Sequence, residues 1–186
     1  MVMSDDLEPD LRLDRRRGLP EALRVLLREL PRADWPDHPN FHGMVSFWLD
    51  RHLMFRRLQA QLRADAQALA EGAMDRDTYA PRLGRFGGLL IQELHGHHQI
   101  EDRHYFPRLV QIEPRIARGF ALLEQDHDAM DPMLHALAET ANAVLRGAPA
   151  EGLASHLDQF GTLLDRHLTD EEEIIVPVLL KSGFAG

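Results

Sequence analysis

The chain has 186 residues, a formal net charge of −9 and no cysteine. This length favours a single domain that is large enough to bury a substantial core. The composition, 44% hydrophobic and 27% charged, is ordinary for a soluble globular protein, and no apolar run has the length of a membrane span. The negative charge argues against nucleic acid and membrane surfaces as partners. Without cysteine, disulfides, thiolate zinc sites and iron–sulfur clusters are excluded, so imidazole, carboxylate and phenol are the remaining strong metal ligands.

The N-terminal region, residues 1–39, is predicted to be an arm followed by a short capping helix. Residues 1–18 are charged and aperiodic, and we assign them no chemistry. Early acidic residues and the lack of an apolar segment argue against a signal peptide, so a cytoplasmic protein is expected. The segment EALRVLLREL after Pro20 has the pattern of a short amphipathic helix that ends before Pro31. The prolines of PRADWPDHPN then predict an irregular connection.

Two long helices are predicted in the first half of the region 40–181. Asn40 is a suitable N-cap for a helix that reaches about residue 70, in which His52 lies in the middle of an apolar stripe. A polar stretch with a glycine separates it from the next helix. That helix is expected over about residues 78–106, and Pro107 should end it or start the exit.

Two more long helices are predicted in the second half. Pro114 begins the third, in which His127 interrupts an apolar stripe, and the fourth follows a break at Gly147 and Pro149. No sustained alternation of apolar and polar residues competes with this pattern. Four long helices joined by short turns predict an all-α fold, an antiparallel up-down-up-down four-helix bundle with a short additional N-terminal helix.

A motif with chemical meaning occurs twice, in HGHHQIEDRHYFP (95–107) and in HLTDEEEIIVP (167–177). In both copies a glutamate follows a histidine by four positions, as His97 precedes Glu101 and His167 precedes Glu171. On a helix, this step places both side chains on one face about one turn apart, which is a metal-ligand spacing. Independent core histidines have no reason to repeat with matched glutamates, so the repeat favours a metal site.

One further histidine precedes each motif, and together with the motifs these give six candidate metal ligands. They are His52, His97, Glu101, His127, His167 and Glu171. Burying so many polar groups in an apolar bundle is unfavourable unless each has a partner, and bound cations supply one. Mixed nitrogen and oxygen ligation without sulfur suits iron, manganese or zinc. Two ions are expected, because two glutamates can bridge them.

Other polar residues near the motifs leave alternatives open. In the acidic run after His167, only Glu171 has the repeat in its favour, and Glu172 is the alternative ligand. Glu93, one turn before His97, could orient that imidazole through its other nitrogen. The remaining histidines of the second helix are expected on flanking faces, at the surface or in support of the ligands: His95, His98 and His104.

The motifs HHQIEDRHYFP and RHLTDEEEIIVP, with DRHLMF around His52 and EQDHDAMD around His127, resemble those of the hemerythrin-like (HHE cation-binding) domain family over about residues 40–180. In that family, a non-heme di-iron centre is held by one histidine on the first and third helices and by His-x-x-x-Glu on the second and fourth. The six candidates match these positions. The resemblance implies two iron ions that bind oxygen, nitric oxide or peroxide, for sensing, detoxification or iron handling. A storage or structural metal module without turnover is the alternative.

One position departs from the oxygen-carrying hemerythrins, which have a second histidine four residues further along the third helix. This chain has Asp131 there. A carboxylate near one iron would favour the ferric state, so oxygen is expected to oxidise the site instead of being carried reversibly. His135, two turns past His127, is a substitute ligand to consider.

Overall fold

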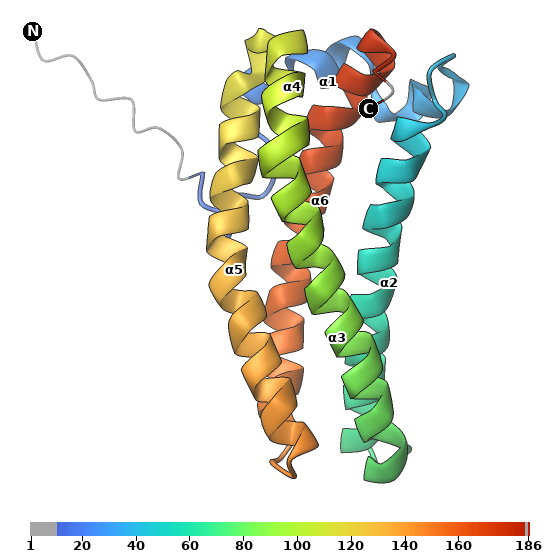
Figure 1. Ribbon diagram of the computed structural model, residues 1–186, viewed down its shortest axis with the longest axis vertical. Coiled ribbons are helices and arrows are strands. Elements are labelled where there is room, and N and C mark those ends of the chain that lie inside the picture. The colour runs from blue at the N-terminus through green and yellow to red at the C-terminus, as the bar shows by residue number, and fades with distance from the viewer. Residues whose placement is uncertain (1–10, 185) are drawn as a thin grey trace, which may run out of the picture.

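The computed structural model describes residues 11–184 and residue 186, and every regular element in this part of the chain is a helix. The four longest helices lie side by side along the long axis of the molecule (Figure 1). They are α2 (Met44–Ala70), α3 (Arg76–Ile100), α5 (Ala117–Leu145) and α6 (Glu151–Ser182). Helix α2 packs against α3 and α6, and α5 packs against the same two helices. The predicted all-α class is confirmed.

Short helical elements precede and connect the long ones: η1 (Glu21–Leu23), α1 (Val25–Glu29), η2 (Arg32–Asp37), η3 (Glu101–Tyr105), α4 (Phe106–Ile112) and η4 (Pro114–Ile116). The predicted capping helix is thus a 3₁₀ turn followed by α1, which packs against α6. The connection that was expected to be irregular contains the 3₁₀ turn η2. Among the described residues, no helix is both long and apolar enough to cross a membrane.

The predicted free arm covers residues 1–18, of which 1–10 lie outside the described residues. From residue 11 on, the prediction of an arm is wrong, because Leu13 and Arg16 are buried. Asn40 also differs from its predicted role. Its side-chain amide donates to the carbonyl oxygen of Leu180 at 2.7 Å, and α2 begins later, after Gly43. Gly43 has φ of +55°, a conformation that only glycine adopts without strain.

The second long helix does not end at Pro107, as the sequence had predicted. Helix α3 continues directly into η3, a π turn, and then into α4, where Pro107 lies in the first turn. A proline inside a regular α-helix lacks an N–H and clashes with the carbonyl four residues earlier. The wider π turn lies where this clash with Arg103 would occur, so the chain stays helical past the proline. Such π turns are frequent at functional sites.

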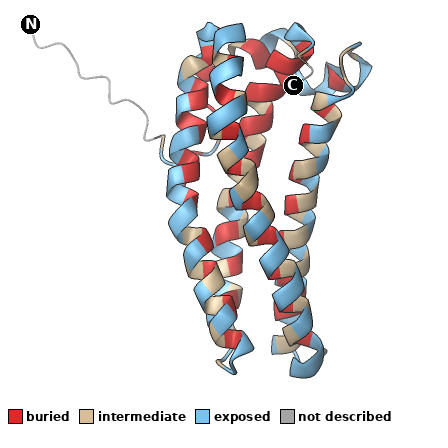
Figure 2. Cartoon of the chain, in the orientation of Figure 1, coloured by how far each residue is buried: buried red, intermediate tan, exposed pale blue. Residues whose placement is uncertain are grey.

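Two apolar clusters fill the interior, and polar residues lie between them. One cluster includes Trp48, Phe106, Phe120 and Ile174, and the other includes Phe55, Leu94, Met130 and Leu164. Every long helix carries buried residues along one side, and these sides face one another (Figure 2). Five of the six predicted metal ligands occupy helix positions between those of the two clusters, and His167 lies between Leu164 and Leu168 at the end of the second cluster. Apolar packing on both sides keeps water from these polar groups.

Candidate metal centre

Seven histidine and glutamate side chains from the four long helices and η3 converge in the interior. Six are the predicted ligands and the seventh is His98. They form two groups, within each of which the candidate ligand atoms lie within 4.8 Å of one another. The trihistidine group consists of His98, His127 and His167, and the mixed group consists of His52, His97, Glu101 and Glu171.

The two glutamates of the mixed group also face the histidines of the trihistidine group. Oε1 of Glu101 lies 2.8 Å from Nε2 of His97, and its Oε2 lies 3.6 Å from Nε2 of His127. Oε1 of Glu171 lies 3.4 Å from Nε2 of His52, and its Oε2 lies 3.4 Å from Nε2 of His167. Each carboxylate therefore has one oxygen beside each group, which is the arrangement that a bridge between two cations requires.

Three of the histidines are oriented by carboxylates behind them. Nδ1 of His127 lies 2.7 Å from Oδ1 of Asp102, and Nδ1 of His167 lies 3.2 Å from Oδ2 of Asp126. A carboxylate only accepts, so Nδ1 carries the proton in each ring and the Nε2 lone pair is left toward the centre. His52 has the same arrangement.

Nδ1 of His52 lies 3.1 Å from Oε1 of Glu172. Glu172, the alternative ligand in the sequence, thus supports His52 from behind. It also accepts hydrogen bonds from Arg56, at 2.6 Å, and from Arg32. Burial alone would raise the pKa of Glu172, but the hydrogen bonds from His52 and Arg56 outweigh it and lower the pKa to about 2. A carboxylate held ionised in this way keeps the imidazole of His52 in a fixed tautomer.

The centre holds most of the buried polar atoms that lack a partner among the described residues. These are both nitrogens of His98, both oxygens of Glu101, one oxygen of Glu171, and Nε2 of His127 and of His167. Unpaired buried polar groups are rare in proteins and need an explanation. Two metal–ligand bonds of about 2.1 Å span up to about 4.2 Å, and the candidate ligand atoms of each group lie within 4.8 Å of one another. The residues therefore fit a cation in each group.

The charges of the buried side chains also fit a cation in each group. Burial and the neighbouring Glu171 raise the pKa of Glu101 well above its usual value. Burial and the adjacent histidines lower the pKa of His98 well below its usual value, so this ring is neutral and can act as a ligand. Two buried glutamates this close repel one another, and cations between them would remove the repulsion.

His98 is the member of the centre that the sequence interpretation placed elsewhere. It is 3% exposed, and its ring stacks on that of His127 with centroids 4.0 Å apart and planes 10° apart. Neighbouring helix residues point about 100° apart, so His97 and His98 can face the two groups on either side of their helix. The adjacent pair of histidines was the available signal. A single inward-facing stripe with a period of 3.6 residues can include His97 or His98 but not both.

Asp131 does not take part in the centre, so the expectation that it could replace an imidazole there is wrong. Its side chain is 56% exposed and lies 3.3 Å from Nδ1 of His95, which is exposed as well. His135 is also exposed. Glu93 does not orient His97, because it accepts a hydrogen bond from Arg51 at 2.7 Å. The third imidazole near one group comes from His98 on the neighbouring helix.

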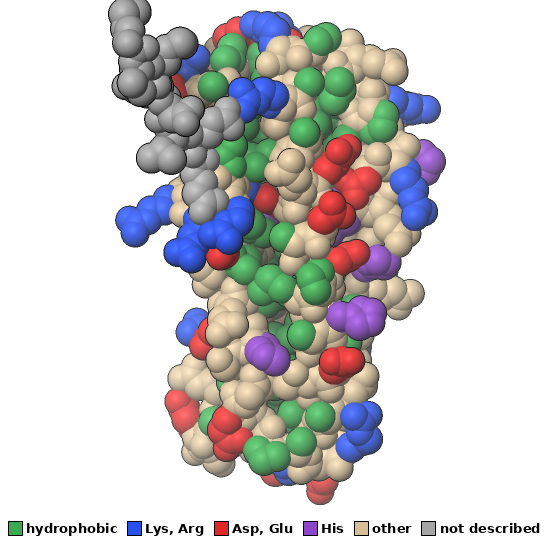
Figure 3. All heavy atoms as spheres, turned by 90° about the vertical axis from the view of Figure 1, so that its left-hand side faces the viewer, with side chains coloured by type: hydrophobic (Ala, Val, Ile, Leu, Met, Phe, Trp, Pro, Cys, Tyr) green, Lys and Arg blue, Asp and Glu red, His purple; other side chains and the backbone are tan. Residues whose placement is uncertain are grey.

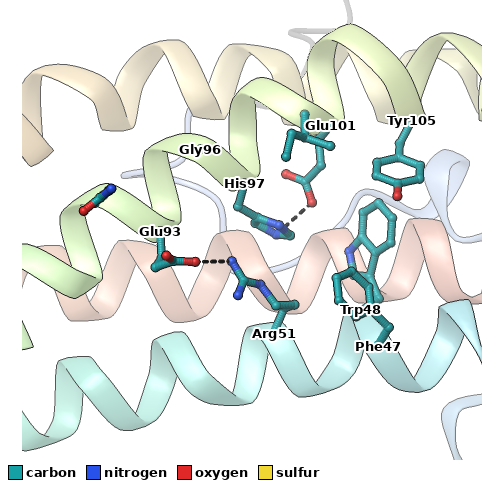
Figure 4. Close-up of a pocket in the computed structure, with 10 residues that line it drawn as sticks. Phe47, Trp48, Arg51, Glu93, Gly96, His97, Glu101 and Tyr105 are labelled. Atoms are coloured by element: carbon teal, nitrogen blue, oxygen red, sulfur yellow. Dashed lines mark hydrogen bonds and ion pairs between the residues drawn. The ribbon is translucent and has the colours of Figure 1, made fainter.

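A cavity of about 510 Å³ opens beside the mixed group, between α2 and α3. His97 and Glu101 lie at its inner side, and the Arg51–Glu93 pair lies across it (Figure 4). Trp48 and Tyr105 form another part of its wall, with their rings in an edge-to-face contact at 5.0 Å. Two members of the mixed group therefore line a cavity, and no member of the trihistidine group does.

These features define a helical protein with buried histidine and glutamate groups that could hold metal ions. The family model of the hemerythrin HHE cation binding domain matches residues 43–179. The chain therefore belongs to this family, and the resemblance recognised in its motifs is confirmed. No curated protein and no solved structure matches the chain significantly.

Proposed function

We propose that the chain binds two iron ions, one at each group, with Glu101 and Glu171 as bridges. The observation that carries this proposal is that each of these carboxylates has one oxygen beside a histidine of each group. The family supports iron, although imidazole and carboxylate without sulfur also suit manganese or zinc. Bound iron would supply redox chemistry and open positions for a small ligand. The long-helix pairings support the up-down-up-down four-helix bundle as the frame of this centre.

We place the small ligand at the mixed group. This group offers two imidazoles where the other offers three, so an ion there has fewer nitrogen ligands. The 510 Å³ cavity reaches His97 and Glu101 but no member of the trihistidine group. A small ligand such as oxygen, nitric oxide or hydrogen peroxide would arrive on this side. We propose that this binding serves sensing, detoxification or iron handling in the cytoplasm. The net charge of −9 supports small molecules, not nucleic acid or membranes, as the partners.

The chain contributes orientation and the exclusion of water. The indole N–H of Trp48 donates to Oε1 of Glu171 at 2.6 Å, which fixes this carboxylate. Glu172, Asp126 and Asp102 hold three imidazoles in the tautomer that leaves Nε2 free. Packing on both sides of the centre leaves the cavity as the approach to the mixed group. Such fixed ligands tune the affinity and reactivity of a bound ion.

The test is to load the protein with ferrous iron and mix it rapidly with oxygen and with hydrogen peroxide. A reactive centre is expected to change its absorption within the mixing experiment and to consume peroxide over many turnovers. Slow oxidation without consumption of peroxide would instead identify metal storage and would contradict the proposed ligand-binding role.

A variant at Gly96 tests the route of access. Gly96 lines the cavity, and a Cβ there would meet no atom within 4 Å, so Gly96→Leu fills free space. We expect Gly96→Leu to slow the reaction without lowering the iron content. Gly88→Leu is the matched control. Gly88 lies on the same helix, is exposed and does not line the cavity, and a Cβ there would also meet no atom within 4 Å. Equal rates for the two variants would contradict access through this cavity.

A further inference from the structure

The segment before the family domain reaches the metal centre. Residues 11–19 lie beside α5 and then continue toward α1 (Figure 1), and the family match begins only at residue 43. The side chain of Arg16 is 3% exposed, whereas those of its neighbours Arg12 and Arg15 are 63% and 61% exposed. Figure 3 shows basic side chains gathered on the surface where the described chain begins, next to the grey residues. Arg16 is therefore the arginine of this segment that turns inward.

Arg16 joins two buried carboxylates on different helices. Its Nε donates to Oδ2 of Asp170 on α6 at 2.7 Å. Its Nη1 donates to Oδ1 of Asp126 on α5 at 2.8 Å, and its Nη2 donates to Oδ2 of the same carboxylate. Nη1 also donates to the carbonyl oxygen of Leu11 at 2.8 Å, which folds the segment around the guanidinium. This fork geometry uses donors that a lysine lacks.

The oxygen of Asp126 that accepts from Nη2 of Arg16 also contacts the candidate metal centre. Oδ2 of Asp126 lies 3.2 Å from Nδ1 of His167, whose Nε2 belongs to the trihistidine group. Asp126 is 2% exposed, so Arg16 and His167 replace water as its hydrogen-bond partners. A chain of contacts thus runs from the N-terminal segment through Arg16 and Asp126 to one candidate metal ligand. The corresponding carboxylate behind His127, Asp102, has a side chain 36% exposed.

We propose that Arg16 is a positioning residue for the trihistidine group, and that residues 11–19 form a clasp which keeps His167 in its metal-binding orientation. Arg16 fixes the position of Asp126, and its charge reduces the negative field that this carboxylate exerts on His167. Mutation of a residue that hydrogen-bonds to a metal ligand commonly lowers metal affinity by about 10–100-fold. Arg16 acts one contact further out, so we expect an effect near the lower value. The metal-related part of this inference rests on the proposed two-ion centre.

The first test needs no metal. In the metal-free protein, the Nδ1 proton of His167 is expected to give a slowly exchanging NMR resonance, because it is buried and bound to Asp126. Arg16→Gln should speed its exchange with solvent. Arg15→Gln removes an exposed arginine of the same segment and should leave it unchanged. A resonance that persists unchanged in Arg16→Gln would overturn the clasp, whether or not the protein binds iron.

The second test measures the release of iron to a chelator from the loaded protein, which is expected to occur in two phases. The phase of the trihistidine group is the one that His98→Leu alters. Arg16→Gln should accelerate this phase about tenfold and leave the other within about twofold. Arg16→Lys keeps the charge but cannot bind both carboxylates as a fork, so it should lie between wild type and Arg16→Gln. Equal acceleration of both phases, or of neither, would overturn the proposal.

A double-mutant cycle separates action through Asp126 from a general loss of packing. If Arg16 acts through Asp126, then Arg16→Gln should have little further effect on iron release in an Asp126→Asn background. Fully additive effects would overturn the proposal. If the wild-type protein retains no iron at all, the proposed function fails, and the metal-free NMR test still decides whether the clasp exists.

Discussion

Replacing His98 by leucine should stabilise the metal-free protein and weaken its metal binding at the same time. Both ring nitrogens of His98 are buried without a partner, and burial keeps the ring neutral. Each unpaired polar group costs roughly 1.5 kcal/mol, so leucine would recover about 3 kcal/mol. Leucine also loses the ring stacking on His127, in which the centroids are 4.0 Å apart, and this loss lowers the gain in stability by about 1 kcal/mol. The expected net gain is about 2 kcal/mol.

A gain of about 2 kcal/mol corresponds to a rise of about 4–8 °C in Tm for a chain of this size. Calorimetry of wild type and His98→Leu, each with chelator and with iron, measures both effects. The variant should melt higher than wild type without metal and gain less from added iron. His95→Leu is the control, because His95 is exposed on the same helix and should change neither value. A metal-free His98→Leu protein that melts below wild type, or one with wild-type iron affinity, would refute the reasoning.

Three further predictions concern pH, the departure from the oxygen carriers, and packing. Burial lowers the pKa of His97 from 6.5 to about 3, so the unfolded chain takes up this proton first and the metal-free protein should lose stability as the pH falls from about 6.5 toward 3. Urea unfolding across this pH range should show that the free energy of unfolding falls less steeply with pH for His97→Leu than for wild type. The same pH dependence in both proteins would contradict this role of His97. Asp131→His should leave iron content and oxygen reactivity unchanged, because Asp131 is exposed and paired with His95; a change in oxidation kinetics would place it at the centre after all. Gly161→Ala should lower the free energy of unfolding by about 1–3 kcal/mol, because the added Cβ would clash with Nε2 of the buried Gln59. An unchanged denaturation midpoint would show that Gln59 can move aside.

The sequence predicted the helical class and the long helices well, because their apolar stripes recur over many turns. It predicted helix ends less well, since these depend on tertiary contacts. Asn40 bonds to Leu180 on α6 instead of capping α2, and the clash expected at Pro107 is avoided by a π turn. The Asn40–Leu180 bond joins residues 140 positions apart, and the π turn has no periodic pattern that would announce it in the sequence.

For the candidate metal centre, too, the sequence predicts the residues that follow a repeated pattern and misses those that depend on tertiary contacts. The structure brings together all six predicted ligands, which were recognisable because the His-x-x-x-Glu step repeats. His98 was assigned to a flanking face because one stripe per helix was assumed, although a centre with two groups can use two neighbouring residues. The family pattern predicts a metal-facing side chain at Asp131, and only the packing of α3 against α5 reveals that it is exposed. Arg16 gave no signal at all, since its role depends on two carboxylates more than a hundred positions away.

The central claim is that two cations lie between these helices and share Glu101 and Glu171. Anomalous X-ray scattering from crystals of the iron-loaded protein tests it most directly. The account predicts two iron peaks about 3.5–4 Å apart, one beside His52 and His97 and the other beside His98, His127 and His167. A single peak after full loading, or iron bound outside these seven side chains, would contradict it.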